Sequence, residues 1–268
     1  MKRVMFTSTG GSQNRCMIHA AGPKGIVSLG IIRSLPTFDL NTILSRPPKL
    51  HEDKGQLISY WRVDNKTCFE LNRRLKAGLK TLETGAGLST IIFAANGCRH
   101  TCITPDTAQV DRIQDYCRSA DIDTSEVEFV IAKSSDIIHQ LPRSEFDLIL
   151  IDGCHNFPSV FVDFYYAAKL LKLGGTLIID DMRIYTCQLA ARFVQSDPGW
   201  NVELKTNRVA FAIKISDTID KEWNHQQFVV RRSSVSELAR AWSFCRNVSY
   251  GFRSRLGLTR TQWRRLLW

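Results

Sequence analysis

Short, almost continuous apolar runs alternate with amphipathic stretches between residues 79 and 215. Five of these runs are rich in aliphatic and β-branched residues and predict strands. They cover residues 80–83, 99–104, 127–131, 146–151 and 175–179. Strands that are apolar on both faces are typical of a parallel sheet with helices on both sides. We therefore expect an α/β fold with a doubly wound, Rossmann-like sheet of five parallel strands.

The same pattern predicts the helices and the last strands of this sheet. One helix begins at Asp106, where Asp106 and Gln109 form a capping pattern and apolar residues follow at helical spacing. Other helices are predicted between the fourth and fifth strands and over 185–194. The runs 200–204 and 209–215 flank a polar turn, which predicts an antiparallel hairpin that closes the sheet.

The segments on either side of the sheet lack this alternation. Residues 1–15 are polar and rich in glycine and serine, which predicts a loose segment. Residues 25–50 mix short apolar runs with prolines and predict an irregular cover, whereas residues 56–80 have a mostly helical pattern. The pattern thus predicts three regions. These are an N-terminal covering segment with helices over 1–77, the sheet domain over 78–216, and a helical, basic, aromatic-rich tail over 217–268.

The charge of the chain is concentrated in that tail. The net charge is +10 at pH 7, and the ten Lys and Arg residues from Lys221 onward stand against two acids. The last 48 residues therefore hold +8 of this charge, and the rest of the chain is almost balanced. The sheet domain consequently need not bind a polyanion. A content of 44% hydrophobic and 23% charged residues predicts a sizeable core and argues against disorder.

The sequence favours a cytoplasmic protein. No run approaches the roughly 20 apolar residues that span a bilayer, and no apolar stretch follows the basic start of the chain to form a signal peptide. The eight cysteines form no C-x-x-C pair, which fits reduced thiols better than a disulfide framework or a zinc site. Peripheral contact with a membrane through the basic tail stays open as an alternative.

Acidic residues and a glycine turn follow the predicted strands, at the edge where open parallel sheets bind ligands. The turn Gly85-x-Gly87 allows a ligand to approach the backbone closely. Thr90 stands where a dinucleotide-binding fingerprint has its third glycine, and Glu83 would repel a pyrophosphate. This edge therefore suits a ligand with positive charge and argues against a nucleotide-dependent oxidoreductase.

Three stretches in order resemble the class I S-adenosylmethionine-dependent methyltransferases, and among them the O-methyltransferase branch. They are residues 83–87 (Glu-Thr-Gly-Ala-Gly), residues 146–155, and residues 170–181. The resemblance covers about 78–215 and implies transfer of a methyl group from S-adenosylmethionine to a hydroxyl of a small molecule. The cofactor-binding residues that it implies are Glu83, Thr84, Gly85, Ala86, Gly87, Ser89, Thr104, Asp106, Ser135 and Asp152.

One position departs from this family. Its members usually end the second strand with an acid that holds the ribose hydroxyls, and here that position is Thr104. Asp106 either takes over the role or only caps the helix that follows it. Ser135 and Asp136 either border the adenine or belong to a loop with a helix cap. The pattern decides neither question, and a degenerate methyltransferase fold that only binds a partner stays open.

The resemblance also implies a group of catalytic residues, Asp152 and His155, beside two further acids. In metal-dependent relatives, acids that match Asp152, Asp180 and Asp181 bind a divalent cation, and three carboxylates suit Mg²⁺, which would acidify a bound hydroxyl. Metal-independent relatives use similar acids for hydrogen bonds, so both roles stay open. His155 is a candidate general base because histidine titrates near neutral pH, or else a loop histidine. Cys154 is expected to be a packed side chain.

Aromatic residues outside the sheet domain have two interpretations each. Tyr60 and Trp61 either close over the ligand or belong to the core. The tail combines arginines with aromatics after a capping box at 234–237. Packing on the domain or on a second copy, as in a homodimer, is favoured over an anionic membrane surface. Nucleic acid comes last, because no RNA-binding module is recognisable.

Overall fold

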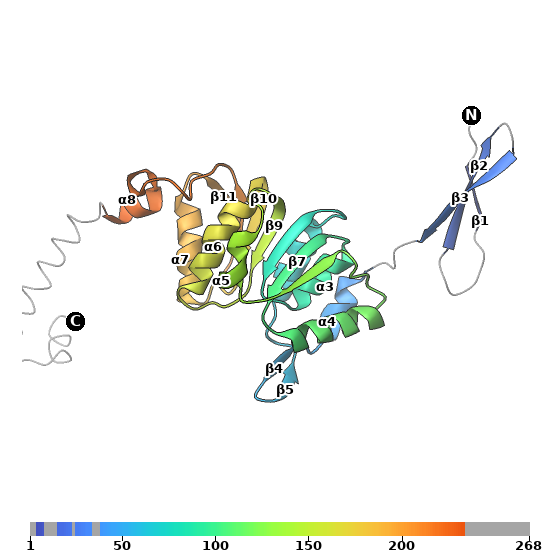
Figure 1. The fold of residues 1–268 in the computed structure, drawn as a ribbon, viewed down its shortest axis with the longest axis horizontal. Helices are drawn as coiled ribbons and strands as arrows, with labels where there is room; N and C mark the ends of the chain where they lie inside the picture. Colours follow the sequence, from blue (N-terminus) through green and yellow to red (C-terminus); the bar gives the residue numbers. More distant parts are fainter. Residues whose placement is uncertain (1–3, 8–14, 23–24, 34–37, 234–268) are drawn as a thin grey trace, which may run out of the picture.

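The computed structural model describes residues 4–7, 15–22, 25–33 and 38–233 of the chain (Figure 1). Its largest unit is a seven-stranded sheet with the order β11-β12-β10-β9-β6-β7-β8. The parallel strands are β6 (Lys80–Thr84), β7 (Arg99–Thr104), β8 (Val127–Ile131), β9 (Phe146–Ile151) and β10 (Leu171–Ile179). β12 (Ala210–Lys214) pairs antiparallel with β10 and with β11 (Trp200–Lys205). The predicted five parallel strands and closing hairpin are confirmed.

Alternate residues of the central strands enter two separate hydrophobic clusters. Along β9, Ile149 and Ile151 belong to one cluster, and Leu148 and Leu150 belong to the other. This follows from the two-residue period of a strand, which sends successive side chains to opposite faces. The first cluster includes α6 (Ser159–Leu170) and α7 (Tyr185–Ser196); the second includes α1 (Leu40–Ser45), α2 (Asn65–Arg74), α3 (Leu88–Ala95) and α4 (Thr107–Ser119). The sheet is thus doubly wound, as predicted.

The N-terminal region contains more strand than its sequence pattern predicts. β1 (Val4–Thr7), β2 (Arg15–Gly22) and β3 (Gly25–Arg33) form a three-stranded antiparallel sheet. The expectation of an irregular cover over 25–50 is therefore wrong for β3 and for α1. The expectation of purely helical additions before the sheet domain is wrong as well. The three domain boundaries stay predictions.

A short hairpin replaces the first part of the helix predicted over 56–80. β4 (His51–Asp53) pairs with β5 (Gln56–Ile58), and α2 begins only at Asn65. The two turn residues, Lys54 and Gly55, both have positive φ, at 50° and 78°. Such a two-residue turn matches the twist of antiparallel strands. Asp64 then starts α2, because its side chain accepts hydrogen bonds from the Lys66 and Thr67 amides.

A buried lysine fixes the closing strand to the neighbouring helix. Lys214 of β12 is almost fully buried, and its Nζ donates to the carbonyl oxygens of Ala168 at 2.7 Å and Leu171 at 3.0 Å. It also pairs with Asp217 at 2.5 Å. A cation at the carboxyl end of α6 complements the helix dipole and satisfies carbonyls that have no partner within the helix.

After the sheet the chain continues into a 3₁₀ turn, η2 (Trp223–His225), and the short helix α8 (Gln227–Ser233). The predicted capping box and the aromatic tail beyond residue 233 lie outside the described residues. Within the ranges that the structure describes, no helix is both long and apolar enough to cross a bilayer. Six of the cysteines in the described ranges, among them Cys68 and Cys187, are free thiols.

Candidate active site

The carboxyl ends of β6 and β9 meet where two glycines leave room for them. Gly85 has φ +91°, and a Cβ atom built on it would lie 2.2 Å from the carbonyl oxygen of Asp152. A Cβ atom on Gly153 would lie 3.2 Å from Thr84 Oγ1. The Asp152 amide donates to the carbonyl oxygen of Thr84 at 3.0 Å. Only glycine fits at position 85, for two reasons: its positive φ and the close approach of the chain after β9 at Asp152. The glycine turn predicted from Gly85-x-Gly87 therefore depends on both.

Glu83 is buried beneath this turn and acts on it through Thr90. Thr90 Oγ1 donates to the Glu83 carboxylate and accepts from the Gly87 amide at 2.9 Å. On the other side, His100 Nε2 lies 3.1 Å from Glu83 Oε1, and His100 Nδ1 lies 2.8 Å from Thr81 Oγ1. The Glu83 carboxylate is thus engaged in a buried network that holds the glycine turn in shape. Thr90, which the sequence marks only as a missing glycine, is the link.

His51 of the β4–β5 hairpin lies over the same turn. Its Nε2 is 3.3 Å from where a Cβ of Gly87 would be, and its Nδ1 lies 2.9 Å from Gln109 Nε2. Gln109 Nε2 also donates to the carbonyl oxygen of Ala86 at 2.8 Å. Because burial lowers the pKa of His51, the ring is neutral; since Nδ1 accepts from the amide, Nε2 carries the proton. That buried N–H has no partner among the described residues.

The second strand ends in a helix cap. Asp106 Oδ1 accepts from the Gln109 amide at 2.9 Å, and the Asp106 amide donates to Thr104 Oγ1 at 3.3 Å. The capping role of Asp106 is therefore confirmed, while contact with a ribose stays a prediction. Gln109, expected to complete a capping box, turns its side chain to His51 instead. On α5 (Ser134–Ile137), Ser135 is partly buried and its hydroxyl donates to Asp136 at 2.9 Å.

His155 lies between two of the predicted acids. Its Nε2 is 3.1 Å from Asp181 Oδ2 and 3.8 Å from Asp152 Oδ1, and its Nδ1 is 3.5 Å from Cys187 Sγ. Burial opposes the charged ring, but the hydrogen bonds to Asp181 and Cys187 and the charge of Asp152 raise the pKa of His155 to about 10. This shift favours the charged ring, whereas a general base needs the neutral one. The catalytic role of His155 stays a prediction.

The acids around His155 differ in their environments. Burial and the neighbouring Asp180 raise the pKa of Asp152 well above its ordinary value. Burial also raises the pKa of Asp180 to about 6, whereas the hydrogen bond from His155 lowers the pKa of Asp181. Asp181 has φ 51°, a left-handed conformation that turns the backbone at the end of β10. The three acids therefore do not form one uniform cluster of carboxylates.

This geometry does not match the expected magnesium site. At this edge, Asp152, His155 and Asp181 have ligand atoms within 4.8 Å of one another, and Asp180 is not in that group; a second such group is Glu83, His100 and Cys102. Mg²⁺ prefers oxygen ligands in octahedral geometry, whereas the His155 ring stands between Asp152 and Asp181. Asp180 is buried, and its Oδ1 has no partner among the residues that the structure describes. The predicted set of three carboxylates is not assembled as an oxygen cage.

Three side chains near the site differ from their expected surroundings. Cys154 is exposed, so its expected role as a packed side chain is wrong. Tyr60 and Trp61 are 64% and 51% exposed and follow β5 rather than lie on a helix, so neither belongs to the core. Asp163 of α6 is fully buried, and burial raises the pKa of its carboxyl, while Ser134 and Thr84 lower it. No motif in the sequence marks Asp163 or His51.

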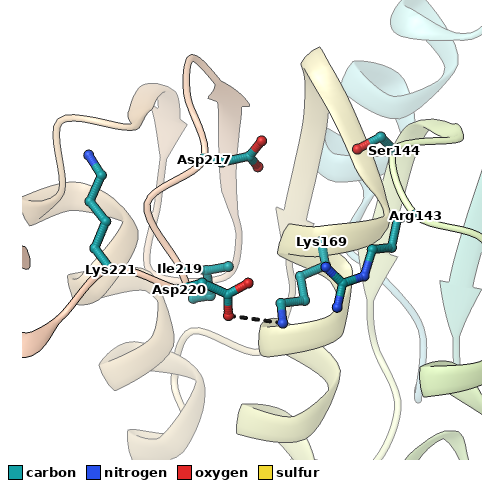
Figure 2. Close-up of a pocket in the computed structure, with 7 residues that line it drawn as sticks. All are labelled: Arg143, Ser144, Lys169, Asp217, Ile219, Asp220 and Lys221. Atoms are coloured by element: carbon teal, nitrogen blue, oxygen red, sulfur yellow. Dashed lines mark ion pairs between the residues drawn. The ribbon is translucent and has the colours of Figure 1, made fainter.

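Two hollows open on the described surface. One, of about 420 Å³, is lined by residues of the 47–65 segment and by Arg208. The other, of about 340 Å³, lies beside the start of β9, between Arg143, Lys169 and Asp220. Figure 2 shows the Lys169–Asp220 ion pair, at 2.9 Å, within this second hollow. Only the first hollow adjoins the edge with Asp181, because the carbonyl oxygen of Arg208 accepts from the Met182 amide at 2.9 Å.

Comparison with known proteins shows what part of the chain is similar to. Residues 82–182 match the family model of a methyltransferase domain. Among solved structures, the O-methyltransferase TomG from Streptomyces achromogenes, in complex with SAM, is 17% identical, with 66% of this chain and 95% of that chain covered and a TM-score of 0.52. A putative caffeoyl-CoA O-methyltransferase from Staphylococcus aureus is 17% identical, with coverage of 57% and 85% and a TM-score of 0.48. No curated protein matches in sequence. The likeness to TomG confirms the Rossmann-like fold.

Proposed function

We propose that this chain, whose residues 82–182 are a methyltransferase domain, transfers the methyl group of S-adenosylmethionine to a hydroxyl group of a small molecule. The observation that carries the proposal is the Gly85 turn, which leaves no room for a Cβ atom beside the Asp152 carbonyl oxygen and is held from below by Glu83 and Thr90. A backbone surface free of side chains at this edge of a parallel sheet suits an extended ligand. The resemblance to O-methyltransferases supports the choice of a hydroxyl.

The proposed cofactor contacts follow the strand ends. The turn at 84–89 contacts the methionine and ribose parts, Thr104 and Asp106 the ribose, and Ser135 the adenine. Glu83 is a positioning residue, because its carboxylate already accepts from Thr90 and lies against His100. His51 Nε2–H is a further donor to the cofactor, since it lies against Gly87 without a partner among the described residues.

The bound cofactor supplies a methyl group activated by a sulfonium ion. The chain contributes mainly position, because holding the acceptor oxygen in line with the methyl group removes much of the entropic barrier. Asp152 is the proposed acceptor of the hydroxyl proton, because its carboxylate follows β9 directly and lies beside the Gly85 turn. His155, as a cation, holds Asp152 and Asp181 in place and offsets negative charge at the site.

Calorimetric titration of the full chain with S-adenosylmethionine is expected to show saturable binding in the micromolar range. Replacing His51 by Ala removes one donor to the cofactor and is expected to weaken binding about tenfold. His225→Ala, an exposed histidine of η2, serves as the matched control and should bind like the wild type. A folded wild-type sample without binding would contradict the proposal and favour the non-catalytic binding protein that acts through its tail.

Magnesium is expected not to bind at this site. The reason is that the His155 ring stands between Asp152 and Asp181, while Asp180 lies outside their cluster. Titration of the EDTA-treated protein with MgCl₂ alone should therefore show no saturable heat, and EDTA should leave the melting temperature unchanged. Saturable binding that disappears in Asp180→Asn would restore the three-carboxylate magnesium site.

A further inference from the structure

The hollow of about 420 Å³ beside the Asp181 edge has two arginines in its lining, and its lining residues lie outside the segment 82–182 that matches the methyltransferase family model. Its walls come from the 47–65 segment and from Arg208 in the turn between β11 and β12. The backbone bond from Met182 to Arg208 fixes this turn next to the end of β10. The volume lies in the range of pockets for small organic molecules. A molecule bound here would therefore adjoin the proposed catalytic residues.

Two guanidinium groups face this hollow without a close carboxylate partner. Arg62 donates to the Val63 carbonyl oxygen at 3.1 Å and to Asn65 Oδ1 at 2.8 Å, which are both neutral acceptors. Arg208 Nε lies 4.0 Å from Asp64 Oδ2, beyond hydrogen-bond distance. Both arginines line the hollow, and Arg62 is held in place by its two hydrogen bonds. Each keeps N–H donors for a ligand.

Asp64 is the acid among the residues that line the hollow, and its carboxylate caps the start of α2. Asp64 Oδ1 accepts from the Lys66 amide at 2.9 Å and from the Thr67 amide at 3.2 Å, and its Oδ2 accepts from Thr67 Oγ1 at 2.9 Å. Its charge therefore offsets the positive end of α2 more than it offsets Arg208. The charges of Asp180 and Asp181 also act on Arg208, whereas the hydrogen-bond partners of Arg62 are neutral, so the preference for an anion is strongest beside Arg62.

An exposed aromatic ring completes the wall. Tyr60 lines the hollow, and its hydroxyl donates to Asp53 Oδ2 at 3.3 Å, which ties the ring to the β4–β5 hairpin. An exposed aromatic beside two arginines is a surface that contacts the flat or apolar part of an organic ligand while the arginines bind its charged group. This combination separates the hollow from a simple ion site.

We propose that this hollow binds the methyl acceptor, and that the acceptor is a small organic anion whose carboxylate or phosphate group is held by Arg62 and Arg208. The proposal rests on the proposed methyl transfer and adds the class of its substrate. Guanidinium groups suit this task because their planar N–H donors match the two oxygens of such a group. The hollow of Figure 2 is lined by other residues, and its Lys169 is paired with Asp220.

The test measures binding of benzoate and of phenyl phosphate to the full chain, with benzamide and phenol as the neutral counterparts. S-adenosylhomocysteine is present at saturation, and its own binding is measured first in every variant. We expect at least one of the anions to bind and the neutral molecules to bind more weakly. Arg62→Gln and Arg208→Gln should each weaken anion binding about tenfold, whereas binding of S-adenosylhomocysteine should be unchanged. Arg208→Lys, which keeps the charge, should retain part of the affinity.

Arg143→Gln, in the hollow of Figure 2, is the matched control and should bind the anions like the wild type. Equal affinity for anions and neutral molecules, or equal anion binding in Arg208→Gln and the wild type, would overturn the proposal, as would absence of anion binding. These outcomes are separable from failure of the methyl-transfer proposal, which would appear as loss of S-adenosylhomocysteine binding in the wild type. The choice between benzoate and phenyl phosphate shows which anionic group the hollow prefers.

Discussion

Alanine at Gly85 is expected to abolish cofactor binding and to destabilise the fold. Its Cβ atom would meet the Asp152 carbonyl oxygen at 2.2 Å, and φ +91° strains any residue with a side chain. Together, the overpacking and the backbone strain should lower the free energy of unfolding by about 2–5 kcal/mol. Binding of S-adenosylmethionine should fall by about a hundredfold or more, because the ends of β6 and β9 must separate. Denaturant unfolding and calorimetry measure the two effects.

Gly78 provides a matched control for this experiment. It has a similar φ of +80°, but nothing lies within 4 Å of the position of its Cβ atom. Gly78→Ala should therefore cost only the conformational strain of about 1–2 kcal/mol and leave cofactor binding intact. If Gly78→Ala and Gly85→Ala had the same effect on both measurements, the contact with Asp152 would have no special role in the site.

Replacement of Lys214 by Met is expected to produce the largest loss of stability outside the site. The change removes the buried donor to the carbonyl oxygens of Ala168 and Leu171, while it keeps a side chain of similar length. Two carbonyls left without a partner, together with the lost charge at the end of α6, should lower the free energy of unfolding by about 2–4 kcal/mol. Urea unfolding measures this change.

Lys172→Met is the matched lysine control. Lys172 pairs with Asp147 at 2.7 Å, but its side chain is 43% exposed, and such surface pairs contribute about 0–1 kcal/mol. Its replacement should change stability little. A Lys214→Met protein as stable as the Lys172→Met protein would mean that water satisfies the carbonyls of α6 in place of the lysine.

The sheet domain could be predicted from sequence because its strands are local signals. Runs such as 146–151 and 175–179 are apolar on both faces. Both faces of such a run are buried when it is a strand of a parallel sheet that helices cover on both sides. The glycine turn and the acids were found for the same reason: each directly follows a strand. Residues that directly follow parallel strands lie at the same edge of the sheet, so their place in the sequence predicts their place in the fold.

The hairpin and the surroundings of the site depended on tertiary contacts. Leu57 and Trp61 have the spacing of a helical face, yet both are exposed, because the Lys54–Gly55 turn sets a hairpin before them. The protonation of His155 could not be predicted either, since Asp181 and Cys187 reach it only through the fold of β10 and α7. A pattern of residues carries no information on such distant partners.

The separation between the family segment and the lining of the acceptor hollow has an evolutionary consequence. Residues 82–182 match the methyltransferase domain, whereas the hollow is lined only by residues between 47 and 65 and by Arg208. Substitutions in the lining can accumulate without altering the register of the central strands or the glycine turn. With the acceptor bound as proposed, acceptor choice and cofactor chemistry are encoded in different parts of the gene, and selection can change the first while it preserves the second.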